Sequence, residues 1–476
     1  MKLVPLWTDV LVWLLVAVVA SYAWYARWRP HLVAPWRRVA RASAGMASLV
    51  IFGIFAVVGL LDSVHYRPLL PETAAGAAPV YSVETRSILD HLLDPLRTQP
   101  EKTYSAPLAI RAFSKETIEL PGGEVRREYP RLKYGGRHVA DESARDRDVL
   151  LKVLTGIAIG TFVWMVLTGV WVTLLARRRS IRPVAMVRRI LQRETEVAWL
   201  AVFATLLVAA LVVTPVALLA SGYHVLGTDK VGQDVLYLAL KSIRTALVIG
   251  TLTTLIMLPF AVLLGIAAGY LRGWVDDVIQ YVYTTLNSIP SVLLIVAAVL
   301  MMQVYIDSHA ELFPTAVERA DLRLLFLCII LGVTTWTGLA RLLRGETLKV
   351  RELDYIQAAR AFGVRHARIM TRHILPNVMH IVLISLVLDF SALVLTEAVL
   401  SYIGVGVDPT MNSFGTLINS ARLEMSRDPM VWWTLAAAFG FMLVLVLAAN
   451  LLADAVRDAF DPRVRVGSAA GAEAAG

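Results

Sequence analysis

Residues Asp354–Asn377 read D-Y-I-Q-A-A-R-A-F-G-V-R-H-A-R-I-M-T-R-H-I-L-P-N, a basic and strongly patterned stretch between two long apolar runs. Four side chains in its first half fall at helical spacing: Tyr355, Ile356, Ala359 and Phe362. Gly363 is expected to end that helix, because glycine adopts turn conformations that other residues resist. A second short helix should follow, and Leu375-Pro376 should stop it and start the next membrane span.

This stretch has two interpretations on physical grounds alone. Two short helices that are joined at a glycine and held at a membrane surface would form a rigid knob for a soluble partner to grip. Alternatively, the stretch is a cytoplasmic loop whose basic face is solvated.

The composition indicates a membrane protein. Apolar residues make up 57% of the 476 residues and charged residues only 17%, and the mean hydropathy is +0.63. Several apolar runs reach about 18 residues, the length needed to cross the hydrocarbon core of a bilayer. Because only helices or closed barrels satisfy the backbone in lipid, the expected fold class is an all-α polytopic membrane protein.

Nine membrane spans are expected along the chain. They lie at about residues 10–25, 44–61, 150–176, 197–220, 243–270, 281–304, 322–343, 378–403 and 432–453. The first of them follows M-K-L-V-P-L-W-T-D, which lacks the basic region and the small-residue cleavage site of a signal peptide. We therefore expect a retained span there.

The net charge of +9 is distributed in a way that argues against nucleic-acid binding. The arginines cluster in short loops beside the spans, and such loops usually lie in the cytoplasm. Residues 27–41, 177–193 and 344–377 are therefore expected to be cytoplasmic, and residues 62–148 and 222–233 external.

The external segment 62–148 is the one sizeable hydrophilic part of the chain. It should be a small mixed domain or a partly ordered loop, with a core of modest size. P-G-G at Pro121–Gly123 predicts a hairpin turn between the runs E-T-I-E-L and E-V-R-R-E-Y.

The stretch Gly227–Leu236 reads G-T-D-K-V-G-Q-D-V-L and precedes the fifth predicted span. Asp229 and Asp234 could cap the helix that follows, because side-chain oxygens accept hydrogen bonds from the free N–H groups at a helix start. A capped turn that braces the external face is favoured over a ligand site.

Glu397 is an ionisable residue near an apolar run, and such residues usually face a bundle interior or a cavity. Asp389 is expected to share its face. Both residues could line a transport path or a gate, or could fix helix packing through internal hydrogen bonds. Gly404 and Gly406 would allow the span to end in an irregular turn.

Pro290 interrupts the sixth span within S-I-P-S, residues 288–291. Proline removes one helical hydrogen bond, so a kink is expected. Broken helices near the midplane often line substrate paths, and a simple kink is the alternative.

Several motifs of catalysis and metal binding are missing. The chain has no G-x-x-x-x-G-K-[ST] sequence, so no P-loop for ATP is predicted. It also lacks H-E-x-x-H and a convincing nucleophile elbow. Cys328 is the only cysteine, which excludes an intrachain disulfide and a Cys-rich metal site. The expectation is a chain that is not an enzyme, without catalytic residues, metal or cofactor.

Three motifs carry a resemblance to a known family. The first motif resembles the "EAA" loop of binding-protein-dependent ABC importer permeases and consists of Ala358-Ala359, Gly363 and Ile374–Asn377. Its ending, R-H-I-L-P-N, is similar to the oligopeptide/dipeptide branch. Residues 227–236 resemble its G-T-D-x-x-G-R-D segment, and residues 396–407 its E-A-x-L-S-F-L-G-x-G segment.

The sequence departs from the family pattern at three positions. Gln357 stands where the loop usually has Glu, Gln233 replaces Arg, and Phe414 replaces Trp in the S-W-G stretch. A salt bridge from position 357 or 233 is therefore not expected.

The resemblance implies roles for three groups of residues. In this family the loop is a coupling helix that docks into a cleft of an ATPase subunit. Its coupling residues would be Tyr355, Gln357, Ala358, Ala359, Gly363, Arg368, His373, Leu375 and Pro376. The translocation path or gate would include Glu397, Asp389, Pro290 and Gly404. An external brace would comprise Gly227, Thr228, Asp229 and Asp234.

The resemblance also implies an architecture: a six-helix permease core with about three extra N-terminal transmembrane helices and a small mixed external domain. The expected segments are N-terminal helices in 1–61, the external insertion in 62–148, two further helices in 149–220, the core in 221–461 with a coupling loop at 344–377, and a disordered tail in 462–476.

The implied partners are a second homologous permease chain, two ABC ATPase subunits that carry ATP and Mg²⁺, a periplasmic substrate-binding protein and the lipid bilayer of a bacterial inner membrane. No nucleic acid is implied. The expected cargo is di- or oligopeptides, with nickel, an opine, an antimicrobial peptide or a glycan fragment as alternatives. A membrane sensor or assembly protein that uses the external segment, and a secondary transporter, are the alternatives of other classes.

Overall fold

The computed structural model describes residues 2–69, 80–119, 125–139, 141–309, 311, 313 and 315–460. Within these residues nine helices are long and apolar enough to cross a membrane, which is the expected number. They are α1 (Trp7–Ala26), α3 (Ser43–Asp62), α6 (Glu142–Arg178), α8 (Trp199–Ala220), α9 (Val235–Leu271), α11 (Ser291–Ser308), α12 with α13 (Ala316–Thr335 and Thr337–Arg351), α15 through α16 (His366–Ile403) and α18 (Trp433–Phe460). The expected tail, 462–476, lies outside the described residues.

Shorter elements connect these helices. The helical ones are α2 (Pro30–Arg41), α4 (Ile88–Leu92), α5 (Asp94–Thr98), α7 (Pro183–Leu191), α10 (Trp274–Ser288), α14 (Asp354–Ala361) and α17 (Phe414–Glu424). The strands are β1 (Lys2–Leu3), β2 (His65–Arg67), β3 (Arg86–Ser87), β4 (Glu116–Glu119) and β5 (Val125–Glu128). Within α15–α16, α15 covers His366–Ile369, a π-helical segment covers Met370–Ile374, and α16 covers Leu375–Ile403.

The chain divides into two compact units. Unit 1 contains Met1–Pro5, Ala40–Thr245 and Asn412–Ala448. Unit 2 contains Leu6–Val39, Ala246–Met411 and the residues from Ala449 onward.

In unit 1, the described residues of the segment 62–148 contain the short helices α4 and α5 and the strands β2 to β5. Antiparallel pairing joins β1 to β2 and β2 to β3. The two expected hairpin strands also pair, with Glu116 opposite Glu128 and Glu119 opposite Val125. The predicted turn at 121–123 lies outside the described residues.

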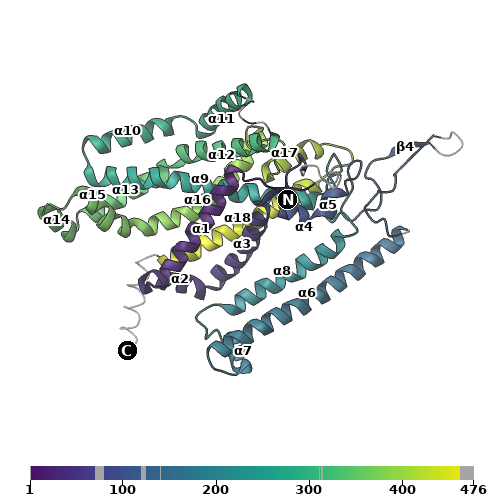
Figure 1. Cartoon of the computed structure of the whole chain (residues 1–476), viewed down its shortest axis with the longest axis horizontal. Coiled ribbons are helices and arrows are strands. Elements are labelled where there is room, and N and C mark those ends of the chain that lie inside the picture. Colours follow the sequence, from purple (N-terminus) through teal and green to yellow (C-terminus); the bar gives the residue numbers. More distant parts are fainter. Residues whose placement is uncertain are drawn as a thin grey trace. The chain divides into compact units, whose positions relative to one another are not determined.

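Helices α6 and α8 of unit 1 lie side by side, with α7 at one end of the pair (Figure 1). Their close approach depends on Gly160, where an added Cβ would lie 2.4 Å from Thr214 Oγ1 and 2.8 Å from the Ala210 carbonyl oxygen. Thr214 Oγ1 also donates a hydrogen bond to the Gly156 carbonyl at 2.8 Å. Small residues and a hydroxyl are typical of helix contacts in lipid.

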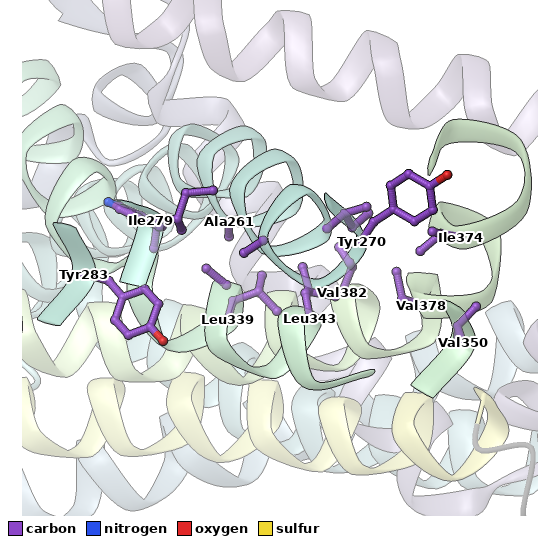
Figure 2. Packing of buried hydrophobic residues seen from close by; sticks show 14 of the residues in the cluster. Ala261, Tyr270, Ile279, Tyr283, Leu339, Leu343, Val350, Ile374, Val378 and Val382 are labelled. Atoms are coloured by element: carbon purple, nitrogen blue, oxygen red, sulfur yellow. The ribbon is translucent and has the colours of Figure 1, made fainter. Parts of the chain in front are cut away.

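Unit 2 packs α9, α13 and α16 around a buried apolar cluster (Figure 2). Cluster members on these helices include Ala261, Leu339, Leu343, Val378 and Val382, each at most 5% exposed.

Pro290 breaks the sixth span completely, so of the two expected alternatives the broken helix is confirmed and the simple kink is wrong. α10 ends at Ser288, Ile289 is extended (φ −91°, ψ 130°), and α11 begins at Ser291 with Pro290 in the position before it. The ring of a proline clashes with a helical preceding residue, which explains the extended Ile289.

The expected start of a new helix at Leu375-Pro376 is confirmed, because α16 begins at Leu375, but the expected stop before it is wrong. The helix that begins at His366 continues to Ile403. The π-helical segment Met370–Ile374 precedes Pro376, the second residue of α16. Its wider turns accommodate the missing N–H group and the bulk of a proline ring.

We predict that Gly160→Ala lowers the free energy of unfolding by about 1–3 kcal/mol, because the new methyl group would overlap α8. Thermal unfolding in detergent or nanodiscs measures the effect. Gly169 lies on the same helix with no atom within 4 Å of an added Cβ. Gly169→Ala is therefore the matched control, and equal destabilisation by both variants would contradict the proposed contact.

Candidate functional site

The knob formed by residues 354–377 lies in unit 2, where α14 and α15 occupy the ends of α13 and α16 (Figure 1). α14 is one-sided: Ile356 is 1% exposed, whereas Tyr355 is 46% exposed. Its end has the geometry expected of a glycine cap, with Gly363 at φ +73°. Val364 N donates to Ala359 O at 3.1 Å across that turn. The predicted helix, glycine turn and second helix are therefore all present.

The inner face of the knob is anchored by isoleucines. Ile356, Ile369 and Ile374 are each at most 1% exposed. They belong to the cluster that also contains Val350 of α13 and Val378 of α16. Figure 2 shows Ile374, Val350 and Val378 gathered in this cluster. The knob is thus held rigidly on the helix ends.

Asn377 links the first turn of α16 to α14. Its Nδ2 donates to Tyr355 Oη at 2.9 Å and to the His373 carbonyl at 2.6 Å. The rings of Tyr355 and His373 lie 6.4 Å apart. The sequence motif contained Asn377, but its role in fixing Tyr355 was not foreseen.

Two further polar contacts fix the surroundings of the knob. Tyr270 Oη and His366 Nδ1 lie 2.9 Å apart, and Arg351 donates to the Tyr270 carbonyl at 2.8 Å. Arg344 forms a bidentate pair with Asp276 through bonds of 2.6 and 2.7 Å. Sequence spacing gave no sign of these contacts, which join residues 68 to 96 positions apart.

The outer face of the knob combines an apolar side chain with positive charge. Phe362 is 87% exposed beside the glycine turn. Arg360, Arg365 and Arg368 are exposed, and within the described part of the chain none of them forms an ion pair. Such a surface suits an acidic partner with an apolar hollow, since arginine and aromatic side chains are enriched at interface centres.

The predicted coupling residues divide into two sets. The exposed set comprises Tyr355, Gln357, Ala358, Gly363, Arg368 and Pro376. The partly buried set comprises Ala359, His373 and Leu375. Gln357 points to Glu352, with Nε2 3.3 Å from Oε2, so the side chain that replaces the family's Glu takes part in a local hydrogen bond.

The residues predicted for a translocation path lie in different environments. Glu397 is 1% exposed and accepts a hydrogen bond from Ser401 Oγ at 2.7 Å. Asp389 is partly buried on α16, and Pro290 is exposed. Gly404 ends α16 at φ +89°, as an irregular turn requires. This hydrogen bond between Glu397 and Ser401 matches the second role considered for Glu397, that of fixing helix packing through internal hydrogen bonds.

The predicted external brace lies in unit 1 and is tied to the segment 62–148. Thr228 Oγ1 accepts from Ser105 N at 2.6 Å and donates to the Thr103 carbonyl at 2.9 Å. Gly227 is at φ +72°, and an added Cβ would lie 2.5 Å from the Ser105 carbonyl. The brace is therefore built from two segments that are far apart in sequence.

Only one of the two predicted capping residues caps the helix. Asp234 Oδ1 accepts from the N–H groups of Leu236 and Tyr237 at 2.8 and 3.2 Å, at the start of α9. Asp229 instead accepts from Val231 and Gln233, so the prediction that it caps α9 is wrong. It is too far back along the turn to reach the first helical N–H groups.

A buried histidine joins the brace to the external segment. His224 Nδ1 lies 2.8 Å from Asp234 Oδ2, and Nε2 lies 3.4 Å from Glu101 Oε1. Glu101 also accepts from the N–H groups of three consecutive residues at 2.8–2.9 Å: Lys133, Tyr134 and Gly135. The sequence did not single out Glu101 or His224, because neither lies in a motif.

His224 and Glu101 stabilise each other's charged form. Burial would lower the pKa of His224, but the carboxylates of Asp234 and Glu101 outweigh it and raise that pKa to about 9. Burial would raise the pKa of Glu101, but His224 and the three backbone N–H groups lower it to about 2. Both groups are therefore charged at neutral pH.

The stability of unit 1 should depend on pH through this pair. The contribution of His224 is complete below its ordinary pKa of 6.5 and is lost as the pH rises through about 9. The contribution of Glu101 is present above its ordinary pKa of 4.5 and is lost as the pH falls toward about 2.

We predict that His224→Gln lowers the free energy of unfolding by about 1.5–3 kcal/mol at pH 6, because charged hydrogen bonds are lost. The deficit should shrink at pH 10, where wild-type His224 is neutral. Thermal unfolding in detergent at both pH values measures this. His138, whose side chain is 42% exposed and pairs with Asp148, provides the control variant His138→Gln. A deficit that does not change with pH would contradict the charged histidine.

The chain is similar to known transport proteins. Residues 261–466 match the family described as binding-protein-dependent transport system inner membrane component. The oligopeptide transport system permease protein OppC of Mycobacterium bovis is 32% identical over 305 residues, which cover 61% of this chain and 96% of that protein. The glutathione transport system permease protein GsiD of Pectobacterium atrosepticum is 31% identical over 247 residues, with 52% and 74% covered.

A third relative is the dipeptide transport system permease protein DppC of Bacillus subtilis, which is 27% identical over 245 residues and is covered over 70% of its length. The family match begins inside α9 and includes the whole knob. This chain belongs to the family of inner membrane components of binding-protein-dependent transport systems.

Proposed function

We propose that this chain is one of two permease subunits of an ATP-driven importer that carries peptides across a bacterial inner membrane. Peptide cargo is inferred from relatives that are named for oligopeptide, dipeptide and glutathione transport. The partners would be a second permease chain, two ATPase subunits that bind ATP and Mg²⁺, and a periplasmic binding protein.

The observation that carries the proposal is the rigid, one-sided knob. Its inner isoleucines are packed on α13 and α16, so a force applied to the knob reaches the helices of unit 2. Its outer face exposes Phe362 and arginines that form no ion pair among the described residues. In the proposed cycle, ATP closes an ATPase dimer, the knobs of both permeases move with it, and access changes from inward to outward.

The knob lies on the side of the membrane that the arginine distribution assigns to the cytoplasm. The external brace and the segment 62–148 would then face the periplasm, where the binding protein delivers cargo. Glu397 in this scheme holds the packing of α16 and the turn that follows it.

We predict that Gly363→Arg reduces ATP-driven peptide uptake at least about tenfold while membrane insertion is retained. The substitution strains a left-handed residue and adds bulk on the docking face. Uptake of labelled peptide into proteoliposomes of the complete complex, together with ATP hydrolysis, measures the coupling. Ala359→Arg should have the same effect, because Ala359 packs against the buried cluster.

Gly273 provides a matched control for Gly363→Arg. It also has a positive φ, of +58°, and open space around an added Cβ, but it lies outside the knob. Gly273→Arg should therefore keep most of the uptake. Normal uptake in the Gly363→Arg variant, or equal losses in both variants, would contradict a docking role for the knob.

The cargo is tested separately by comparing uptake of labelled dipeptides and oligopeptides with uptake of nickel, an opine and a glycan fragment. We expect peptides alone to be transported in an ATP-dependent way. Uptake driven by an ion gradient without ATP would instead indicate a secondary transporter.

A further inference from the structure

Asp389 is the middle residue of α16. The helix has 29 residues, and 14 of them lie on either side of Asp389. About 21 Å of helix therefore separates this aspartate from each end. Its side chain is too short to reach the headgroups from that depth, so the carboxylate has to be satisfied inside the membrane.

Asp389 has no polar partner in its own chain. Within the part of the chain that the structure describes, its carboxylate forms no hydrogen bond and no ion pair. Glu397, the other acidic residue of α16, is 1% exposed and accepts a hydrogen bond from Ser401 Oγ at 2.7 Å. Helix packing therefore accounts for Glu397 and leaves Asp389 unexplained.

Two hydroxyl side chains share one side of α16 with Asp389. Ser385 and Thr396 lie four residues before it and seven residues after it, which places all three within about 40° around the helix axis. Asp389 and Thr396 are partly buried, and Ala392 between them is exposed. A line of polar side chains along a membrane helix is typical of a surface that faces a water-filled cavity.

The apolar part of the exposed surface of α16 lies on another side. Leu388, Leu395 and Val399 are 42%, 44% and 51% exposed. They lie about 80–120° around the helix axis from Asp389. This apolar side suits lipid tails, whereas the line of Ser385, Asp389 and Thr396 does not.

We propose that Asp389 binds the amino-terminal ammonium group of a peptide that passes along α16. The inference rests on the proposed function, because it takes peptides as the cargo. A carboxylate only accepts hydrogen bonds, and an ammonium group offers three donors and the opposite charge. Peptides of different sequence share this group, so one aspartate can serve many of them.

Cysteine labelling of the complete complex in proteoliposomes tests the site without relying on transport. Ala392→Cys places a reporter one turn from Asp389, and trimethylammonium-ethyl methanethiosulfonate, which does not cross lipid, is the reagent. Cys328 is the only cysteine of the sequence and is 0% exposed, so the wild type gives the background. Leu395→Cys, on the apolar side of α16, is the matched control and should react slowly.

Peptides should protect the Ala392→Cys reporter according to their charge. We expect tetra-alanine to protect it at about one-tenth of the concentration that N-acetyl tetra-alanine needs, because acetylation removes the cation that pairs with Asp389. Adding Asp389→Asn should make the two concentrations equal. The proposal is overturned if the reporter is not labelled, if neither peptide protects it, or if both protect it equally in the presence of Asp389.

Uptake into proteoliposomes provides the second test. Asp389→Asn should lower ATP-driven uptake of tetra-alanine about tenfold, whereas Asp389→Glu keeps the charge and should keep most of the uptake. Asp458→Asn, on an exposed aspartate near the end of α18, is the control.

Two results of this second test would also overturn the proposal. One is normal uptake by the Asp389→Asn variant. The other is loss of the assembled complex in that variant during size-exclusion chromatography, since the carboxylate would then pair with a cation of the second permease chain. A wild-type complex that shows the expected labelling and protection but imports no peptide would contradict the proposed function and still support the site.

Discussion

Close helix contact at glycine is the constraint on which unit 2 depends. Three glycines of α9 would each place an added Cβ within 3 Å of a neighbouring helix: Gly250, Gly265 and Gly269. Gly250 meets Phe390 of α16, and the other two meet α13 at Leu343 and Thr347. Apolar side chains are solvated as well by lipid tails as by other apolar side chains, so the hydrophobic effect does not drive these helices together. Close helix contacts must hold them instead.

The glycine contacts also determine where the knob lies. They fix α13 and α16, and the ends of these two helices supply Val350 and Val378 for the cluster that buries Ile356 and Ile374. The knob can therefore be small and still be rigid. Its outer residues are left available for recognition because its inner residues perform the anchoring.

The sequence predicted features that depend on local patterns. The spans follow from runs of apolar residues, the hairpin strands from alternation around a turn, and the knob from helical spacing interrupted by Gly363. Asp234 was recognised as a cap because a cap is a local feature. Backbone detail at the prolines was predicted only in part. Pro290 breaks the helix, where a break or a kink was expected. A new helix begins at Leu375 as expected, but it continues the preceding helical segment without a stop.

Contacts between distant residues could not be predicted from one sequence. Glu101 and His224 are separated by more than a hundred positions, and no spacing rule connects them. The same holds for Arg344 and Asp276. The external segment 62–148 illustrates the result: composition marked it as a possible loose insertion, whereas Glu101, Thr103 and Ser105 bind it to the turn that precedes α9.

The π-helical segment Met370–Ile374 has a consequence for how α15 and α16 are oriented. A π turn contains one residue more than an α turn, and each residue of an α-helix rotates the chain by about 100°. The side chains of α15 therefore face a direction about 100° away from the one that an uninterrupted helix would give them. If the π turn shifted by one residue along the chain, only the side chains at its old and new positions would change direction. The axis of α16 would stay fixed, while the side chains exposed on the knob would change.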